Sequence, residues 1–288
     1  IAVAVGYGVM LLWDVILLYQ YFPQGEKGAF LFLRWVDQFL PLAFTGLFIN
    51  IGLFAHLVIM WVGPLQVQVQ GLFVGAPYHD VPALVAFLTI LVTTVNFVVS
   101  VEVNFYPKYK NYYSLFNDKG AVGDITQAGE EMLKVLNVEL KYTALKQLLA
   151  TALAISLGGL LLEYVPLGFN DLMEGYFRTL CVGYGIYAVA NTMLLLLLYF
   201  TDYKGALAAS GCFAGGTVLF TVISLFFSRV YYGFGFLTGS AVFFLIAAFR
   251  LDYYTKRLPY YILSVQPIVA EDKTGFFTRL GCFLEEKI

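Results

Sequence analysis

The polar side chains inside the apolar stretches of this sequence are the first candidates for chemistry. Asp14, flanked by Trp13 and Val15, is the carboxylate placed most clearly inside an apolar run. An ionisable group is costly within a bilayer unless it is paired or faces water, so such groups mark transport pathways and proton relays. Asp14 therefore predicts a cavity or proton-coupling role. The alternative is a structural pairing of this carboxylate with Arg34, Asn50 or a tyrosine hydroxyl.

A second group of polar residues surrounds the next apolar stretch. Asn50 and His56 would lie about a turn and a half apart on a helix, and His56 is the histidine expected inside the membrane. A lone histidine at such a position is more often a hydrogen-bonded packing residue than a ligand, and both interpretations stay open. Arg34, Asp37 and Gln38 precede the stretch and predict its cytoplasmic mouth, where an Arg–Asp ion pair is the simpler alternative.

Further polar side chains recur in two later stretches. Small polar residues commonly join helices at about 0.6 kcal/mol each, which would explain any single one as packing. Their spread over several stretches favours a shared polar cavity instead. The mixture of amides, carboxylates and aromatic faces is also compatible with carbohydrate binding, on composition alone. The residues are Thr93, Thr94, Asn96, Ser100, Glu102 and Asn104, followed by Tyr184, Tyr187, Asn191 and Thr192.

Motifs that would give these residues an enzymatic role are missing from the sequence. There is no G-x-x-x-x-G-K-[ST], H-E-x-x-H, G-x-S-x-G or D-x-D pattern, which are signatures of ATPases, zinc proteases, serine hydrolases and metal-dependent glycosyltransferases. The sequence predicts no catalytic residue, no metal and no cofactor. The enzymatic alternative is a membrane-bound transferase with His56 as its base, and that histidine has no companion acid on the same helix face.

Two other patterns are interpreted as carrying no chemistry. Gly183, Gly185 and Ala188 match G-x-G-x-x-A, but they lie inside an apolar stretch with no strand before them. The three cysteines are scattered without a C-x-x-C, so they predict neither a disulfide framework nor a zinc site. They are Cys181, Cys212 and Cys282.

The composition determines which elements must position these residues. Of the 288 residues, 60% are apolar and 12% are charged, whereas a soluble domain carries about 25% charged residues. This excludes a soluble globule, and the net charge of −2 leaves no basic domain for a nucleic acid. A bilayer crossing needs about 20 apolar residues, and backbone groups in lipid must be satisfied within helices. The prediction is an all-α, polytopic transmembrane helix bundle with about seven spans, at 1–21, 40–62, 81–103, 145–164, 177–200, 204–227 and 231–249.

The basic residues orient these spans. Of the 17 lysines and arginines, 15 fall in the segments after the first, third, fifth and seventh stretches, and only Arg178 and Arg229 fall on the other side. Because positively charged loops stay in the cytoplasm, the sequence predicts a multi-pass membrane protein with a cytoplasmic C-terminus.

The connector between the third and fourth stretches has its own pattern. Asp124 and Gln127 resemble a capping box at a helix start, and Ile125, Met132 and Leu136 recur at helical spacing. This predicts an amphipathic helix on the membrane face that continues into the fourth stretch. A docking surface for a cytoplasmic partner is the alternative.

Two glycine pairs predict close helix packing. Gly211 and Gly215, and Gly235 and Gly239, each form a G-x-x-x-G in one of the last two stretches. Such pairs let two helix backbones approach closely.

An ordered series of motifs over about residues 30–266 resembles the family of PelG-like exopolysaccharide exporters. No single motif is diagnostic, and the resemblance rests on their order. His56 departs from it, since a more strongly charged or aromatic residue is expected there. The motifs are GLFINIG at 46–52, PYHD at 77–80, VEVNFYPKY at 101–109, YYSLF at 112–116, LDYYT at 251–255 and QP at 266–267.

The resemblance implies a division of the chain. PelG-like proteins belong to the MOP superfamily of MATE-like flippases, whose helices form two similar halves. The resemblance also implies a location in the bacterial inner membrane. On this map residues 1–21 are the last helix of the first half and 22–39 a cytoplasmic linker. Residues 40–249 are the second half, with the amphipathic connector at 105–145, and 250–288 are a cytoplasmic tail. The sequence would then lack the N-terminal part of the transporter.

The function implied by the resemblance is export of a Pel-like, amino-sugar-containing polysaccharide for a biofilm matrix, by alternating exposure of a cavity between two halves. Asp14 and Glu102 would contact amino or hydroxyl groups of the polymer, which suits carboxylates because such a polymer is partly cationic. The expected partners are the polysaccharide, the lipid bilayer, a cytoplasmic glycosyltransferase and other Pel-type membrane components.

Two alternatives to this function stay open. The first is another activity of the same superfamily, either flipping of a lipid-linked oligosaccharide or cation-coupled drug export. The second is a membrane scaffold for a polysaccharide synthase, which would recruit cytoplasmic enzymes through the 105–145 connector and the tail.

Overall fold

The computed structural model describes residues 2–22, 30, 32–71, 73–117, 120–164, 168–265 and 275–285, and their side chains except those of 2–3, 159–164 and 265. The chain divides into two compact units, one formed by residues 1–43 with 267–288 and the other by residues 44–266. Each unit is described by itself.

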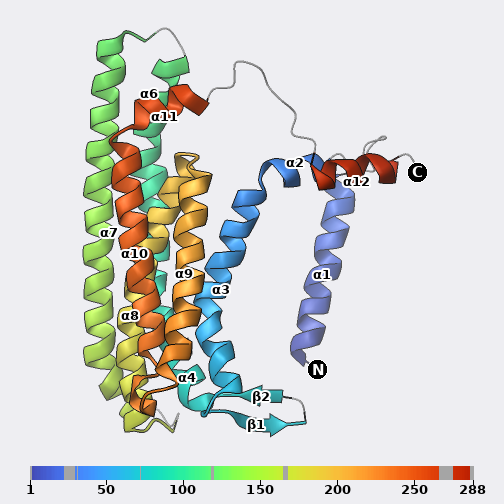
Figure 1. Cartoon of the computed structure of the whole chain (residues 1–288), viewed down its shortest axis with the longest axis vertical. Coiled ribbons are helices and arrows are strands. Elements are labelled where there is room, and N and C mark those ends of the chain that lie inside the picture. Colours follow the sequence, from blue (N-terminus) through green and yellow to red (C-terminus); the bar gives the residue numbers. More distant parts are fainter. Residues whose placement is uncertain are drawn as a thin grey trace. The chain divides into compact units, whose positions relative to one another are not determined.

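Helices dominate the unit of residues 44–266, which confirms the predicted all-α class (Figure 1). Its one described sheet is a two-stranded antiparallel hairpin in the connection after the first helix. Gly71, with a φ of +60°, makes the turn of that hairpin. The elements are α3 (Leu40–Val62), β1 (Val67–Gln70), β2 (Phe73–Gly75), α4 (Pro77–Phe87), α5 (Leu91–Val99), α6 (Tyr106–Asn117), α7 (Val122–Tyr164), α8 (Asp171–Tyr199), α9 (Tyr203–Ser224), α10 (Phe234–Thr255) and α11 (Leu258–Val265).

The described residues of the smaller unit form one long helix and two short ones. They are α1 (Ala2–Tyr21), α2 (Leu33–Gln38) and α12 (Phe276–Glu285), of which α2 and α12 pack against each other.

Six helical segments of the described residues are long and apolar enough to cross a membrane. They coincide with six of the seven predicted spans, and this supports a multi-pass membrane protein. The remaining predicted span, 145–164, forms the second half of α7 and ends on side chains outside the described set. The six segments are Ala4–Tyr21, Leu40–Val62, Pro77–Asn117, Asp171–Tyr199, Tyr203–Ser224 and Arg229–Thr255.

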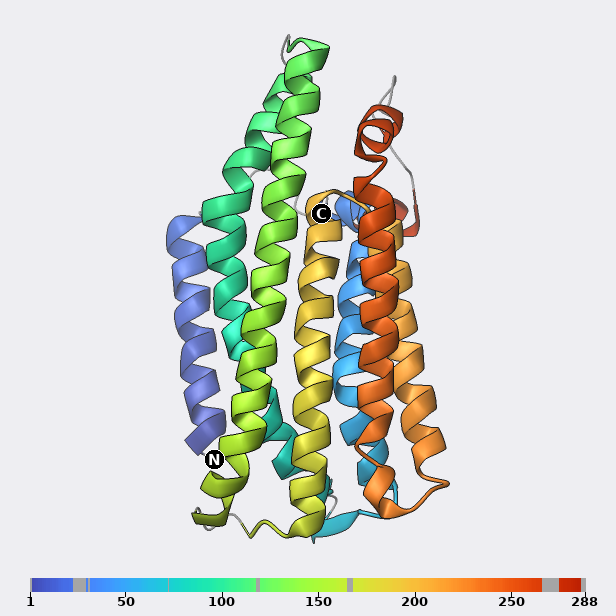
Figure 2. The same ribbon diagram turned by 90° about the vertical axis from the view of Figure 1, so that its left-hand side faces the viewer.

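Helix α8 is the centre of the larger unit. Of its most apolar window, 78% is buried within the protein, compared with 39% for the α9 and α10 segments. It lies between α7 and α10 in Figure 2 and also packs against α4. Polar side chains on α8 can therefore contact residues of several neighbouring helices.

Helices α9 and α10 meet through one of the two predicted glycine pairs. A Cβ atom placed on Gly235 would lie 2.5 Å from the Cα atom of Thr221, and one on Gly239 would lie 2.8 Å from the Cα atom of Thr217. The prediction of close packing is confirmed for this pair. It is wrong for Gly215, which has nothing within 4 Å of the same position.

The third predicted span is an irregular helix that runs from α4 to α6. A 3₁₀ turn at Leu88–Ile90 joins α4 to α5, and a π-helical segment at Ser100–Phe105 joins α5 to α6. Pro107 follows this segment and lacks the N–H that a regular helix would need at that position. Because π-helical turns often occur at functional sites, Glu102 within this segment is a candidate for function.

The connector forms a helical hairpin of α6 with the first half of α7 (Figures 1 and 2). The predicted continuity into the fourth stretch is confirmed, since α7 is one helix of 43 residues. The position of the connector on the membrane face stays a prediction. The helix also begins at Val122, so Asp124 lies in its first turn and is not its N-cap.

Candidate functional site

The predicted site residues divide between the two units. In the smaller unit, Asp14 is exposed on α1 and makes no hydrogen bond or ion pair with the described residues. Its proposed role in a cavity or in proton coupling stays a prediction. Arg34 is also exposed, on α2.

Asp37 holds the N-terminus of α12. Its carboxylate accepts hydrogen bonds from the backbone N–H of Thr278 at 2.7 Å, from the hydroxyl of Thr278 at 2.7 Å and from the backbone N–H of Phe277 at 3.3 Å. The Thr278 hydroxyl, followed by these backbone donors, lowers the pKa of Asp37. The described contacts thus give Asp37 a structural role in joining α2 to α12.

We expect substitution of Asp37 by asparagine to loosen α12. A lowered pKa means that the bound carboxylate stabilises this contact above its ordinary pKa of about 4 and that the effect is lost as the pH falls through the lowered value. The protection of the α12 amides, measured as exchange relative to the intrinsic rate at each pH, should therefore be high at neutral pH in the parent protein and fall in acid. In Asp37→Asn this protection should be low at both pH values, whereas the control Glu285→Gln, at the far end of α12, should be protected like the parent. Equal exchange in all three proteins would contradict this role.

Two of the predicted residues meet at the centre of the larger unit. His56 of α3 and Tyr184 of α8 are both buried, and the Nε2 atom of His56 lies 3.2 Å from the hydroxyl of Tyr184. The ring of Phe236 from α10 lies 4.5 Å from the imidazole, centroid to centroid. The pair is thus part of a closed aromatic cluster.

His79 belongs to the same cluster and was missed by sequence reasoning. Its ring lies 5.1 Å from that of His56 and is fully buried. The sequence analysis placed it in a loop before the third span, but α4 already begins at Pro77. A proline at the first position of a helix is a known start signal, and it would have moved the boundary to include this histidine.

Asn96 lies in a different place, on a polar seam between α5 and α7. Its amide donates to the Thr143 hydroxyl at 2.7 Å and to the Ser100 hydroxyl at 3.2 Å, and Lys146 donates to its oxygen. Thr93 continues the seam by donating to another α7 side chain. For Asn96 the structure shows helix-to-helix bonding, and it does not bring this residue to His56.

Glu102 is exposed on the π-helical segment. Its carboxylate accepts a hydrogen bond from the hydroxyl of Tyr199, at the end of α8, over 3.0 Å. Nearby along the same segment, the amide of Asn104 donates to the carboxylate of Glu139 on α7 at 2.8 Å. This end of the unit therefore presents fixed carboxylates on its surface.

The other two predicted cavity residues make few polar contacts. Asn50 is exposed on α3, and its amide donates to the Gly46 carbonyl of its own helix at 2.8 Å. Asn191 is half-buried on α8 and makes no side-chain hydrogen bond with the described residues. The structure therefore does not gather all of the predicted polar residues into one cluster.

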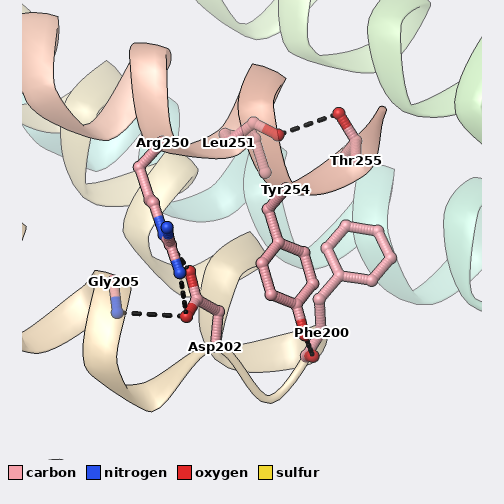
Figure 3. Close-up of polar contacts among 7 residues, drawn as sticks. All are labelled: Phe200, Asp202, Gly205, Arg250, Leu251, Tyr254 and Thr255. Atoms are coloured by element: carbon pink, nitrogen blue, oxygen red, sulfur yellow. Dashed lines mark hydrogen bonds and ion pairs between the residues drawn. The ribbon is translucent and has the colours of Figure 1, made fainter. Parts of the chain in front are cut away.

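An ion pair with a buried carboxylate, at the α8–α9 turn, was also missed (Figure 3). The guanidinium of Arg250 on α10 donates to both oxygens of Asp202, at 2.6 Å from Nε and 2.8 Å from Nη2. Asp202 also caps α9 by accepting from the N–H of Gly205 at 3.1 Å. The side chain of Asp202 is 5% exposed and that of Arg250 is 30% exposed. In the sequence, Arg250 was used only as a marker of orientation.

Tyrosine hydroxyls hold the same turn. Tyr254 donates to the carbonyl of Phe200 at 3.0 Å (Figure 3). Tyr109 donates to the carbonyl of Tyr199 at 3.2 Å. Thr201, the residue after Phe200, adopts a φ of +62°, which is strained for a β-branched residue. A strained backbone conformation persists where the surrounding contacts hold it in place. The conformation of this turn is therefore fixed by its contacts.

The described residues contain no group of three or more histidine, cysteine or acidic side chains that could hold a metal ion. The arrangement provides a buried imidazole cluster, exposed carboxylates near the α6–α7 hairpin and a rigid turn beside them. Such groups can bind, position and carry protons.

Comparison with known proteins connects this geometry to one family. The model of the PelG family, described as "Putative exopolysaccharide Exporter (EPS-E)", matches residues 1–263 of the 288. No curated protein and no solved structure matches the chain. The family match includes the span with His56, the irregular helix with Glu102 and the Asp202–Arg250 turn. The chain belongs to the PelG family of exopolysaccharide exporters.

Proposed function

We propose that this chain moves a Pel-like, amino-sugar-containing polysaccharide across the cytoplasmic membrane, with the larger unit as one half of the transporter and α1 as the last helix of the other half. The family and the six apolar helices support export through a membrane. The single observation that carries the substrate class is the exposed carboxylate of Glu102, held by a tyrosine at the end of an apolar helix.

The setting of Glu102 suits a sugar that carries an amino group. A carboxylate accepts strong, charge-assisted hydrogen bonds from an ammonium group. The Tyr199 hydroxyl fixes one carboxylate oxygen at 3.0 Å, and the other oxygen has no described partner. The π-helical segment places this carboxylate on the surface of the unit, where it can meet a passing polymer.

The distribution of charge supports the orientation of the proposed exporter. Fifteen of the 17 basic residues fall on the side of the α6–α7 hairpin in the sequence-based topology, which puts this hairpin and Glu102 at the cytoplasmic face. A polymer made in the cytoplasm by a glycosyltransferase would then meet Glu102 first, before the apolar part of the bundle.

Substitution of Glu102 by glutamine tests the proposal. The loss of a charge-assisted hydrogen bond costs about 1.5–3 kcal/mol, and about 1.4 kcal/mol corresponds to a factor of ten. We therefore expect secreted polysaccharide to fall about tenfold or more, with unchanged amounts of the protein in the membrane. Secretion at the parental level from Glu102→Gln would remove this carboxylate from the polymer route.

The matched control is Glu130→Gln. Glu130 is an exposed carboxylate on α7 that makes no described polar contact, so its loss should leave secretion unchanged. Asp14→Asn, tested in parallel, examines the predicted role of the α1 carboxylate. A decrease in Glu102→Gln alone would limit the polymer contact to the larger unit.

A scaffold for a polysaccharide synthase is the second candidate, favoured by the α6–α7 hairpin. A groove of about 800 Å³ lies along this hairpin and is lined by Lys108, Glu131, Lys134 and Glu139 among others. Export by the purified protein in liposomes, from polymer supplied on one side, would separate the two candidates. A scaffold would move no polymer across the liposome membrane. In cells, polysaccharide synthesis would then depend on the residues of this groove and not on Glu102.

A further inference from the structure

The two histidines of the chain lie against each other in the core of the larger unit. Both are fully buried, and their ring centroids are 5.1 Å apart with the planes at 69°. The Nε2 atom of His56 meets the Tyr184 hydroxyl, whereas neither ring nitrogen of His79 has a hydrogen-bond partner among the described residues.

The walls of this pair are aromatic. Tyr176 of α8 faces His79 with a centroid distance of 5.6 Å, Tyr184 of α8 faces His56 at 6.1 Å, and Phe236 of α10 covers His56 at 4.5 Å. Tyr176 and Tyr184 are the titratable groups that face the pair from another helix in these contacts. Each hydroxyl is engaged, that of Tyr176 by the carbonyl of Arg229.

The nearest acidic residue along the chain is also engaged elsewhere. Asp80 follows His79 on α4, and one oxygen of its carboxylate accepts from the Trp61 indole at 2.9 Å and from the backbone N–H of Ala76 at 2.9 Å. These bonds fix the start of α4, so that His79 is held in place without a bond to its own ring.

Packing alone does not account for this arrangement. A buried polar group without a partner costs about 1–3 kcal/mol, and a phenylalanine would fill the same aromatic cluster without that cost. A neutral imidazole offers one N–H and one free nitrogen, so an unpartnered ring can accept a proton and pass one on. Such orphaned groups in a native core need an explanation, and a catalytic role, a bound water or ion, and stored strain are the usual ones.

The position of the pair along the helices suits transfer across the bundle. His79 lies in the first turn of α4, beside the β1–β2 hairpin, and His56 lies on α3 six residues before the end of that helix. Six residues span about 9 Å of helix. The order His79, His56 and Tyr184 therefore leads from the β-hairpin end of the unit toward its interior.

We propose that His79 and His56 form a proton-binding pair whose loading and release drive the conformational cycle of the transporter. The proposal rests on the export function above and adds the coupling ion. A proton from the β-hairpin side adds to a free ring nitrogen of His79, moves to His56 and leaves from the same pair after the conformational change. Two imidazolium rings 5.1 Å apart would repel, so the pair carries one extra proton at a time.

The histidine count makes the binding step directly measurable. The 288-residue chain with ¹⁵N-labelled imidazoles, placed in lipid nanodiscs, gives signals from its two histidines. As the pH is lowered from about 8 to about 4, across the ordinary histidine range, we expect one imidazolium per chain and no second one. His79→Gln and His56→Gln assign the signals. Two imidazolium rings per chain, or none at any pH, would overturn the proposal.

The coupling step is measured in cells at two external pH values. If protons enter as polymer leaves, the parent secretes more polysaccharide at acid than at alkaline external pH, and both His79→Gln and His56→Gln lose this difference. Tyr187→Phe is the matched control, because Tyr187 is equally buried on α8 and its described ring contacts are with phenylalanines and not with a histidine. A retained pH response in the histidine variants would also overturn the proposal.

Tyr184→Phe keeps the proposal testable if a histidine variant fails to reach the membrane. It preserves the ring but removes the hydroxyl that meets His56, so it should change the His56 signal and weaken the pH response of secretion. Failure of the proton pair is distinguishable from failure of the polymer route. If the proton pair fails, Glu102→Gln is still deficient in secretion but the parent shows no single imidazolium. If the polymer route fails, the parent shows one imidazolium but Glu102→Gln secretes at the parental level.

Discussion

Substitution of Arg250 by methionine is expected to destabilise the larger unit by about 3–5 kcal/mol, the usual cost of leaving one partner of a buried ion pair without its counterion. Asp202 is 5% exposed and receives both guanidinium hydrogen bonds. After the substitution, only the N–H of Gly205 among its described donors remains. The measurement is the midpoint of thermal unfolding in detergent, with the amount of protein in membranes as the cellular readout.

The same site predicts an order among variants. Asp202→Asn should cost less than Arg250→Met, because the arginine side chain is 30% exposed and can regain water. Asparagine is also a good N-cap and can still accept from Gly205. The double variant removes both charges and should be more stable than Arg250→Met alone. A double variant as unstable as Arg250→Met would show that the lost packing of the arginine stem, and not the unpaired carboxylate, dominates.

An exposed ion pair one turn further along α10 is the matched control. Lys256 and Asp252 form an ion pair at 2.7 Å with side chains 71% and 63% exposed. Exposed pairs of this kind contribute about 0.3–0.5 kcal/mol. Lys256→Met should therefore leave the unfolding midpoint nearly unchanged, although it removes a positive charge from the same end of the same helix.

The fold class follows from the sequence because its physical cause is local. An apolar run of sufficient length has to be a helix in lipid, whatever its neighbours are. The six apolar helices were accordingly predicted close to their observed positions. The boundary errors arose where a turn signal was overlooked, as at Pro77, whose omission moved His79 from the core into a loop.

The candidate site was less accessible because its contacts are long-range. His56 and Tyr184 lie 128 positions apart and Asp202 and Arg250 lie 48 apart, so no local pattern relates them. His56 and Tyr184 were identified because they are polar residues inside apolar stretches. This criterion could not distinguish Asn96, which bonds α5 to α7, from residues that meet in the imidazole cluster. Both kinds of residue are polar side chains inside apolar helices, and the sequence does not show which neighbouring helix each one faces.

The glycine pairs show the same limit and lead to the second large expected effect. Gly235→Ala should destabilise the larger unit by about 1–3 kcal/mol or more, as overpacking does, because the new Cβ would lie 2.5 Å from a backbone atom of Thr221. A backbone atom cannot rotate away as a flexible side chain would. Gly239→Ala meets the Thr217 backbone at 2.8 Å and should behave similarly. Thermal unfolding in detergent measures both effects.

Gly215→Ala is the control that the sequence pattern would not have suggested. Gly215 also belongs to a G-x-x-x-G, but a Cβ there meets nothing within 4 Å. Alanine is favoured over glycine within a helix by about 1 kcal/mol, so this variant should be neutral or slightly stabilising. If Gly215→Ala were as harmful as Gly235→Ala, the α9–α10 contact would not be the reason for the effect. Opposite changes in stability at two glycines of the same G-x-x-x-G spacing would show that the backbone contact, and not the motif, determines the packing of α9 against α10.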